Sequence, residues 1–464
     1  MGRSIVRAGL LAALGAGSIG AAAPASAGAA SRPLGVTWMR SDAAPGTPAK
    51  YDQVGVIKVG PASARNVLVL EPGTSAGSAY FVPLARWIVA TARGWQVWAV
   101  ERRENLLEDQ SVLDRYKRGK VSATALYDYY LGYLKDPSIT KHIAAIPTAS
   151  VEYAKQWGLN VAVQDLRTVI TAARRRGGKV VLGGHSLGGS VVTAYATWDF
   201  GGHAGADQLA GLVYIDGSSD TTPETSAQAT AALAGLDAPT ATPWLAFGGI
   251  AAPYAGIYNA TGSSAALLDP NGPSLGQSSG LLPADLVPPI PVTNVGQYGY
   301  ALNAATSPPS LLAAQAHLGT GLTPSGGWNG AGARTPITRF ETMFSGAPML
   351  GVDGTEWYFP ERLTLDTGAI DNGNANPAQV VLGLHATMGH HLAKSLRIYA
   401  FGARLEGPVA LANTRALAAQ SGIPARHLTL VNEQATYSHN DPAGAYPNNI
   451  FFAHLVPFLD KVAS

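Results

Sequence analysis

The turn at residues 184–189, Gly-His-Ser-Leu-Gly-Gly, constrains the fold of this chain more than any other segment. A short apolar run, Lys-Val-Val-Leu at residues 179–182, precedes it, and a helix-forming run, Ser-Val-Val-Thr-Ala-Tyr-Ala, follows from residue 190. Glycine permits backbone angles and close approaches that other residues do not, so a strand can turn directly into a helix at this spacing. The segment therefore predicts a buried strand, a tight turn that carries Ser186, and a helix.

The same alternation of strand and helix occupies both ends of the chain. Apolar runs that predict strands occur at residues 35–41, 53–60, 66–70, 95–100, 212–215, 396–401 and 427–431. Helical spacing occurs at residues 79–91, 159–176, 409–419 and 449–462. Strands that alternate with helices predict an α/β fold, with a mostly parallel central sheet and helices on both of its faces.

The alternation stops between residues 218 and 394, which are rich in Gly, Pro, Ala, Ser and Thr and carry scattered aromatic residues. Because this segment is too long for a loop in a compact domain, we predict an inserted cap subdomain over residues 218–394. The core is then expected to consist of residues 28–217 and 395–464. A second, smaller insertion is expected at residues 103–158, where Tyr and charged residues mix without the rhythm of a sheet.

The first residues have the features of a signal peptide. Arg3 and Arg7 give a positive start, residues 8–24 are apolar and small, and Ala-Ser-Ala at residues 25–27 is a cleavage signal. The apolar run is short and rich in Ala and Gly, which argues against a membrane anchor. We expect residues 1–27 to be removed and the mature chain to be secreted, without a stable membrane span.

Composition excludes several classes of function. The chain has no cysteine, which rules out disulfides, thiolate nucleophiles and cysteine metal sites. Its net charge is only +2 and it has no long basic run, so we expect no nucleic-acid partner. His390 and His391 are adjacent but have no carboxylate at ligand spacing, and we therefore predict no metal and no cofactor. The sequence does not indicate the oligomeric state.

Four serines stand in a Gly-x-Ser-x-Gly pattern: Ser75, Ser186, Ser274 and Ser278. Only Ser186 has both a good strand before it and a good helix after it. Ser274 and Ser278 lie in loop-like sequence, and Ser75 follows an earlier strand of the series. Ser186 is therefore the predicted nucleophile of a strand–turn–helix elbow.

The segment around Ser186 resembles the nucleophile elbow of esterases and lipases in the α/β-hydrolase superfamily. The resemblance covers residues 35–217 and 395–464, and residues 218–394 lie where that superfamily commonly carries its cap. It implies an α/β-hydrolase fold and the chain order nucleophile, acid, histidine.

The resemblance also implies the base and its carboxylate partner. His439 lies in a polar loop after the strand at 427–431, where the superfamily places its base, whereas His427 and His454 lie in the last strand and the last helix. The acid is expected a few residues after the strand at 396–401, usually as Asp, and the nearest carboxylate there is Glu406. Asp216, which ends the strand at 212–215, is the alternative, and we favour Glu406.

Two backbone N–H groups are expected to form an oxyanion hole, which stabilises the negative charge that builds up on a carbonyl oxygen under attack. One belongs to Leu187, directly after the nucleophile. The other lies in the loop at residues 71–78, which resembles the superfamily's His-Gly-x loop with Pro72 in place of His. By that match Thr74 supplies the second N–H, with Ser75 next in line.

These residues together predict a serine hydrolase that cleaves small-molecule or lipid-like carboxylic esters through an acyl-enzyme. A serine peptidase or aminopeptidase of the same superfamily is one alternative, although its elbow is often Gly-Gly-Ser-Tyr-Gly-Gly. A binding protein with a hydrolase fold but no catalysis is another. Arg102, Arg103 and Glu104 follow the fourth strand and either bind substrate or pin the cap; we favour pinning.

Overall fold

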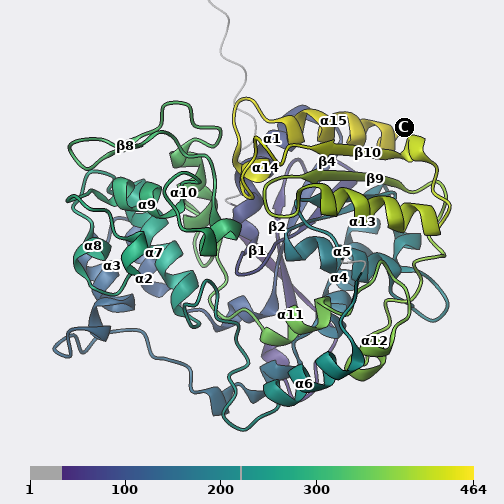
Figure 1. The fold of residues 1–464 in the computed structure, drawn as a ribbon, viewed down its shortest axis with the longest axis horizontal. Coiled ribbons are helices and arrows are strands. Elements are labelled where there is room, and N and C mark those ends of the chain that lie inside the picture. The colour runs from purple at the N-terminus through teal and green to yellow at the C-terminus, as the bar shows by residue number, and fades with distance from the viewer. Residues whose placement is uncertain (1–33, 220–221) are drawn as a thin grey trace, which may run out of the picture. The chain divides into compact units, whose positions relative to one another are not determined.

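The computed structural model describes residues 34–219 and 222–464, and Leu34–Ser464 form one compact unit (Figure 1). The predicted signal peptide at residues 1–27 lies outside the described residues. Within the described part of the chain, no helix combines the length and the apolar character needed to span a bilayer.

The described residues contain a central sheet of eight strands in the order β1-β2-β4-β3-β5-β6-β9-β10. The strands are β1 (Val36–Arg40), β2 (Gln53–Val59), β3 (Asn66–Glu71), β4 (Trp95–Glu101), β5 (Val180–His185), β6 (Gly211–Ile215), β9 (Arg397–Gly402) and β10 (Leu428–Asn432). β2 runs antiparallel to β1 and β4, and every other neighbouring pair is parallel. This order and pairing give the chain the α/β-hydrolase fold, as the sequence predicts.

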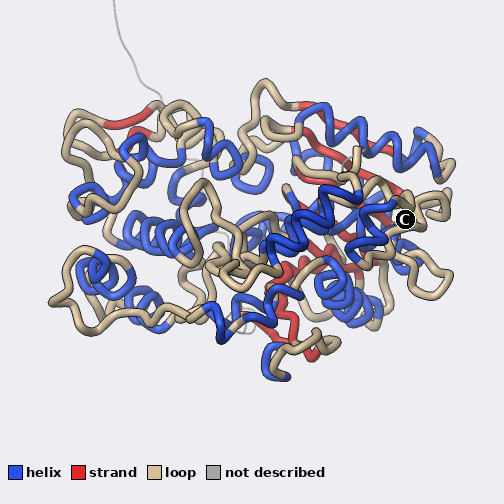
Figure 2. Tube along the Cα trace, turned by 60° about the horizontal axis from the view of Figure 1, so that its bottom comes forward, coloured by secondary structure: helices blue, strands red, loops and turns tan. Residues whose placement is uncertain are grey.

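Helices cover both faces of the sheet, as Figures 1 and 2 show. One face packs against α4 (Leu159–Arg174), α5 (Leu187–Thr197) and α13 (Gly407–Gln420). The other face packs against α1 (Val82–Thr91) and α15 (Ile450–Ala463). The strands read as almost continuous apolar runs because both of their faces are buried.

Residues 218–394 divide between two parts of the molecule. Their first and last helices, α6 (Ser226–Leu236), α11 (Glu361–Thr367) and α12 (Pro377–Leu382), join the apolar cluster that contains α4 and α5. The middle of the segment builds a helical lobe on the other side of the molecule (Figure 1). The lobe contains α7 (Tyr254–Leu268), α8 (Leu275–Ser278), α9 (Asn294–Leu302), the hairpin of β7 (Gly321–Leu322) and β8 (Trp328–Asn329), and α10 (Ile337–Ser345).

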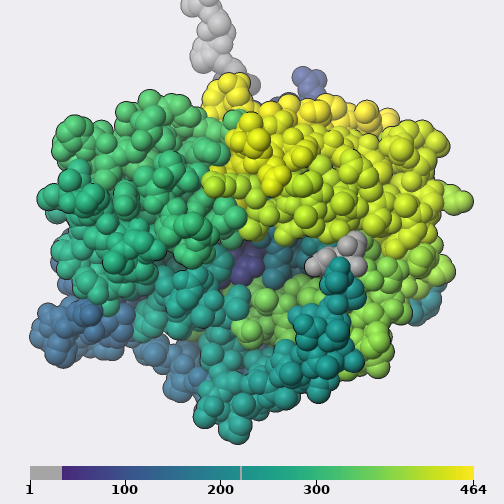
Figure 3. Space-filling model, viewed as in Figure 1, coloured from purple at the N-terminus to yellow at the C-terminus, as the bar shows by residue number. Residues whose placement is uncertain are grey.

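The helical lobe also includes the smaller insertion at residues 103–158. Its helices α2 (Ser111–Lys117) and α3 (Ala123–Tyr130) pack against α7. Leu126 and Trp157 share one apolar cluster with Trp244, Ile257 and Trp357 from the larger insertion. Two segments distant in sequence thus build one lobe, and the surface is hollowed between that lobe and the sheet region (Figure 3).

Candidate active site

Ser186 stands between β5 and α5 in the strained backbone conformation of a nucleophile elbow. Its φ is 55° and its ψ is −132°, angles that a residue with a side chain rarely adopts. A Cβ on Gly184 would lie 2.2 Å from the carbonyl oxygen of Gly188, so only glycine fits there. Ser274, by contrast, caps the short helix α8, and Ser278 ends it. The strand–turn–helix unit predicted around Ser186 is confirmed.

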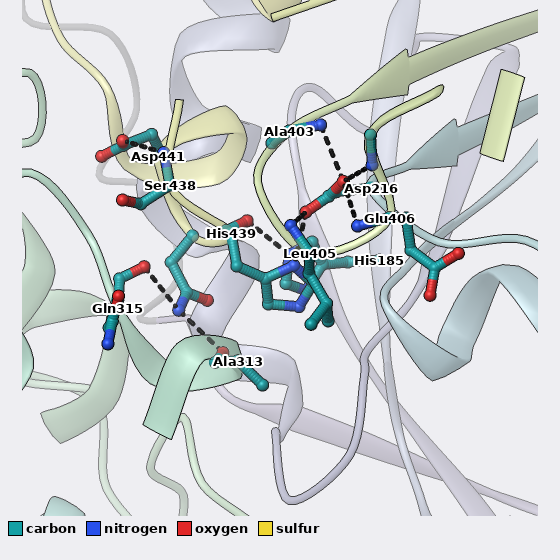
Figure 4. Close-up of polar contacts among 12 residues, drawn as sticks. His185, Asp216, Ala313, Gln315, Ala403, Leu405, Glu406, Ser438, His439 and Asp441 are labelled. Atoms are coloured by element: carbon teal, nitrogen blue, oxygen red, sulfur yellow. Dashed lines mark hydrogen bonds and ion pairs between the residues drawn. The ribbon is translucent and has the colours of Figure 1, made fainter. Parts of the chain in front are cut away.

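His439 makes its carboxylate contact with Asp216 and not with Glu406. The Nδ1 of His439 donates a hydrogen bond of 2.7 Å to Oδ2 of Asp216, and both side chains are buried. The side chain of Glu406 points away from His439 (Figure 4). The prediction that Glu406 is the partner of His439 is therefore wrong, and the alternative, Asp216, takes that position.

The loop that was expected to supply the acid instead supplies hydrogen-bond donors to it. The carboxylate of Asp216 accepts backbone N–H groups from Ala403 at 2.7 Å, Leu405 and Glu406 at 3.1 Å, and Gly407 at 3.2 Å. These donors lie in the turn that leads into α13 and at its first residue, where the helix dipole also favours negative charge. Glu406 thus contributes to the site through its main chain.

These contacts decide the charge of Asp216. Burial acts to raise the pKa of this carboxyl, but the hydrogen bond and charge of His439, together with the backbone donors of Ala403 and Glu406, lower it below its ordinary value. Asp216 is therefore a carboxylate at neutral pH. Its place at the carboxyl end of β6, beside the end of β9, is the sequence signal that pointed to it.

His185, next to the nucleophile, supports His439. Its ring lies between those of Tyr80 and His439, with ring centroids 5.2 Å and 4.3 Å away. Its Nε2 donates a hydrogen bond of 3.0 Å to the carbonyl oxygen of His439. Burial and the neighbouring His439 lower the pKa of His185 to about 3, so the ring is neutral. The sequence analysis did not predict this supporting contact.

Asn440 ties the loop of His439 to the helical lobe. Its Oδ1 accepts a hydrogen bond of 2.8 Å from the Tyr80 hydroxyl, and its Nδ2 donates to the carbonyl oxygens of Ala313 and Gln315 at 3.1 Å and 3.2 Å. Asp441 adds a second tie, since it accepts from Nδ1 of His317 at 2.6 Å. The lobe and the loop of His439 are therefore held in one hydrogen-bonded unit.

Ser186, His439 and the predicted oxyanion residue Thr74 line one small cavity of about 50 Å³. Leu187 is the first residue of α5, where a helix leaves its N–H groups without an intrahelical acceptor. A Cβ on Gly73 would lie 2.8 Å from the Cβ of Ser186, so the loop backbone passes directly beside the nucleophile. This placement fits an oxyanion hole made by Leu187 and Thr74.

Arg102 fixes the loop at residues 71–78. Its guanidinium is buried and contacts Glu71 at 2.8 Å and Glu356 at 2.6 Å, and it also donates to the carbonyl oxygens of Pro72 and Gly73. Glu356 belongs to the larger insertion, so Arg102 joins that insertion to the loop. This is the pinning role that we favoured from the sequence.

Arg103 pairs within the core instead, at 3.1 Å from Asp52 and 2.6 Å from Asp165.

In residues 34–219 and 222–464, no three His, Asp or Glu side chains gather as the ligands of a metal ion would. His390 lies in a turn, with its Nδ1 3.3 Å from the carbonyl oxygen of Gln420.

No protein-family model and no curated protein sequence matches the chain. Several solved structures resemble it at low identity. A candidate lipase from Sulfolobus solfataricus is 13% identical with a TM-score of 0.45, over 92% of this chain and 93% of its own. A monoglyceride lipase from Saccharomyces cerevisiae is 10% identical with a TM-score of 0.39, over 95% and 99%. An esterase from Thermogutta terrifontis is 12% identical with a TM-score of 0.36, over 93% and 100%. The fold itself is defined by the strand order and pairing given above.

Proposed function

We propose that this protein hydrolyses carboxylic esters through an acyl-enzyme formed on Ser186. The observation that carries the proposal is the buried pair of His439 and Asp216, whose imidazole reaches the same cavity as the strained Ser186. A serine hydroxyl becomes a nucleophile when a positioned base takes its proton, and a base held by a carboxylate is the usual arrangement.

In the first half of the reaction, Oγ of Ser186 attacks the ester carbonyl carbon while Nε2 of His439 accepts the hydroxyl proton. Asp216 holds the imidazole through Nδ1 and stabilises the imidazolium that forms. The N–H groups of Leu187 and Thr74 stabilise the carbonyl oxygen as it becomes negative. The C–O bond to the alcohol then breaks, and the alcohol leaves with the proton from His439.

In the second half, a water molecule takes the place of the alcohol. His439 accepts a proton from the water as its oxygen attacks the acyl carbon. The bond to Oγ of Ser186 then breaks, Oγ regains the proton from His439, and the carboxylic acid leaves. The enzyme returns to its starting state, and one ester and one water have become one acid and one alcohol.

The lining of the catalytic cavity favours an ester over the amine end of a peptide. An aminopeptidase needs a carboxylate to hold the positive amine of its substrate, and among the described residues no Asp or Glu lines this cavity. The wall consists instead of small, aromatic and amide side chains, including Tyr80, Asn259 and Phe344. A neutral ester group suits such a wall.

Labelling by a fluorophosphonate and hydrolysis of p-nitrophenyl butyrate together test the proposal. We expect both in the wild type and neither in Ser186→Ala, while Ser278→Ala, a serine in the same sequence pattern but outside the catalytic cavity, behaves as the wild type. Cleavage of aminoacyl-p-nitroanilides without ester hydrolysis would favour the peptidase. A wild type that is neither labelled nor active would favour a binding protein.

Secretion is part of the same proposal. The positive start, the apolar run and the Ala-Ser-Ala site support export with cleavage after Ala27. Expression of the full chain in a secreting bacterial host, followed by N-terminal sequencing of the protein in the medium, is expected to give Gly28 as the first residue. Retention of the uncleaved chain in the cell membrane would contradict it.

A further inference from the structure

The helical lobe contains a second cavity, larger than the catalytic one. Its volume is about 170 Å³, and it lies among α3, α7, α9 and the segment around α8. Its wall is mainly aliphatic and aromatic, with Leu126, Ala265, Leu275, Leu282, Leu286 and Leu302 among its residues. No charged side chain of the described residues lines it. An apolar cavity of this kind excludes ions and accepts apolar groups.

The two cavities adjoin each other. Phe247, Asn259 and Ala314 line both, so these three side chains form a wall that the cavity at Ser186 shares with the cavity in the lobe. They come from three separate parts of the larger insertion: the segment before α7, α7 itself, and the 3-10 helix Pro309–Ala314. The junction is therefore a feature of the assembled lobe and belongs to no local motif.

Each of the three amide side chains that line the lobe cavity makes a hydrogen bond through one of its polar atoms, while Oε1 of Gln297 is buried without a partner. Oδ1 of Asn259 accepts a hydrogen bond of 2.9 Å from the Tyr298 hydroxyl. Nδ2 of Asn294 donates to the carbonyl oxygen of Asp269 at 2.8 Å, and Nε2 of Gln297 donates to that of Leu286 at 2.7 Å. Because these hydrogen bonds hold the amide groups in place, an apolar ligand can bind without displacing them.

We propose that the lobe cavity binds an apolar chain of the ester whose carbonyl group is held at Ser186. This inference rests on the proposed ester hydrolysis and gives it a substrate class, esters with a chain of several methylene groups and no charge. Each methylene that leaves water for such a wall is expected to raise kcat/KM about fourfold until the cavity is full.

The chain can belong to the acid or to the alcohol of the ester, and two substrate series distinguish them. In the first, p-nitrophenyl esters run from acetate to dodecanoate, below their micellar concentrations. In the second, alkyl acetates run from ethyl to dodecyl. We expect kcat/KM to rise with chain length in one series, which assigns that side of the ester to the lobe cavity.

Ala265→Phe tests whether the lobe cavity is the cause. Ala265 is in α7 and lines the lobe cavity but not the catalytic one. The added ring fills the cavity, so a long chain should no longer be favoured. We expect the ratio of kcat/KM for the substrate with an eight-carbon chain to that for the substrate with a two-carbon chain to fall to a tenth of its wild-type value or less. Ala232→Phe, at an exposed position of helix α6, is the matched control and keeps that ratio.

Ala301→Leu, from α9, gives a smaller obstruction of the same cavity if Ala265→Phe does not fold. Flat rates in both series would overturn the inference, and so would a chain-length gain that both cavity variants preserve. Failure of the proposed function is separate, because the wild type would then hydrolyse no ester of either series, the acetates included.

Discussion

Asp216 and Glu356 are both buried carboxyl groups beside the catalytic cavity, and their surroundings act on them in opposite ways. The pKa of Asp216 lies below its ordinary value, because the imidazole of His439 and the backbone N–H groups at the start of α13 outweigh the effect of burial. Burial and the nearby Glu104 raise the pKa of Glu356 far above its ordinary value, although Arg102 acts to lower it. The surroundings therefore favour the charged form of Asp216 and oppose the charged form of Glu356.

Two further buried carboxyl groups, those of Glu101 and Glu108, have surroundings that raise their pKa as the surroundings of Glu356 do. Burial raises the pKa of Glu101 to about 7, even though its carboxylate accepts a hydrogen bond of 2.6 Å from the N–H of Ser78. Burial, followed by the charge of Asp353, also raises the pKa of Glu108 well above its ordinary value. The difference teaches that the donors at Glu101 and Glu108 do not offset the effect of burial on the pKa, whereas the imidazole of His439 and the backbone N–H groups at Asp216 do.

Removing the charge of Asp216 gives the largest expected effect. Asp216→Asn cannot hold the imidazole in the same tautomer, so kcat/KM for p-nitrophenyl butyrate is expected to fall by about 10⁴. Glu406→Gln, which keeps the backbone N–H to Asp216, is expected to stay within about threefold of the wild type. A larger loss in Glu406→Gln than in Asp216→Asn would reverse the assignment of the acid.

The error over Glu406 shows where sequence reasoning stops. The turn at Ser186 was predictable because glycine spacing, strand and helix are all local. Asp216 and Glu406 follow neighbouring strands of the sheet and both precede His439, so chain order admits either one. The choice depends on the φ of 43° at Asp216 and on N–H groups nearly 190 positions away, which no local pattern encodes.

The helical lobe teaches the same lesson at larger scale. The sequence showed where the sheet rhythm stops, and both insertions were expected from it. It did not show that the ends of the larger insertion pack beside α4 and α5, or that Trp157 of one insertion packs against Trp244 of the other, with ring centroids 6.2 Å apart. Apolar residues predict burial, but their partners are decided by tertiary packing.

Arg102→Met tests the contacts of Arg102 with Glu71 and Glu356, and its effect on stability is expected to be the next largest. The substitution leaves Glu71 and Glu356 without their buried cation, and breaking such a pair costs about 3–5 kcal/mol of unfolding free energy. Urea unfolding near pH 7 measures the loss. Adding Glu356→Gln to the variant is expected to restore part of it, and a double variant no more stable than the single one would contradict the pairing.

Glu341 shows the effect of burial on a carboxyl pKa where no cation opposes it. Burial alone raises the pKa of Glu341 from 4.5 to about 8 in the folded protein. A carboxyl group with a raised folded pKa stabilises most below its unfolded pKa, and that stability is lost as pH rises from about 4.5 through about 8. Glu341→Gln has no carboxyl group to ionise and therefore does not lose this stability. In urea unfolding, the free energy of unfolding of Glu341→Gln should exceed that of the wild type by about 2 kcal/mol near pH 9 and be similar to it near pH 5. An equal difference at both pH values would contradict the raised pKa.

Leu405→Asp gives the smallest expected effect and asks whether a carboxylate in the loop after β9 can replace Asp216. The side chain of Leu405 is 37% exposed, and its own N–H is one of the donors to Asp216. A carboxylate there would remain hydrated and would lack the N–H groups that hold Asp216, so kcat/KM of Leu405→Asp is expected to stay within about threefold of the wild type. For the same reason, Leu405→Asp added to Asp216→Asn is expected to recover less than about a tenth of wild-type kcat/KM. Full recovery in the double variant would mean that any carboxylate near His439 suffices, and that the backbone donors around Asp216 do not determine which residue serves as the acid.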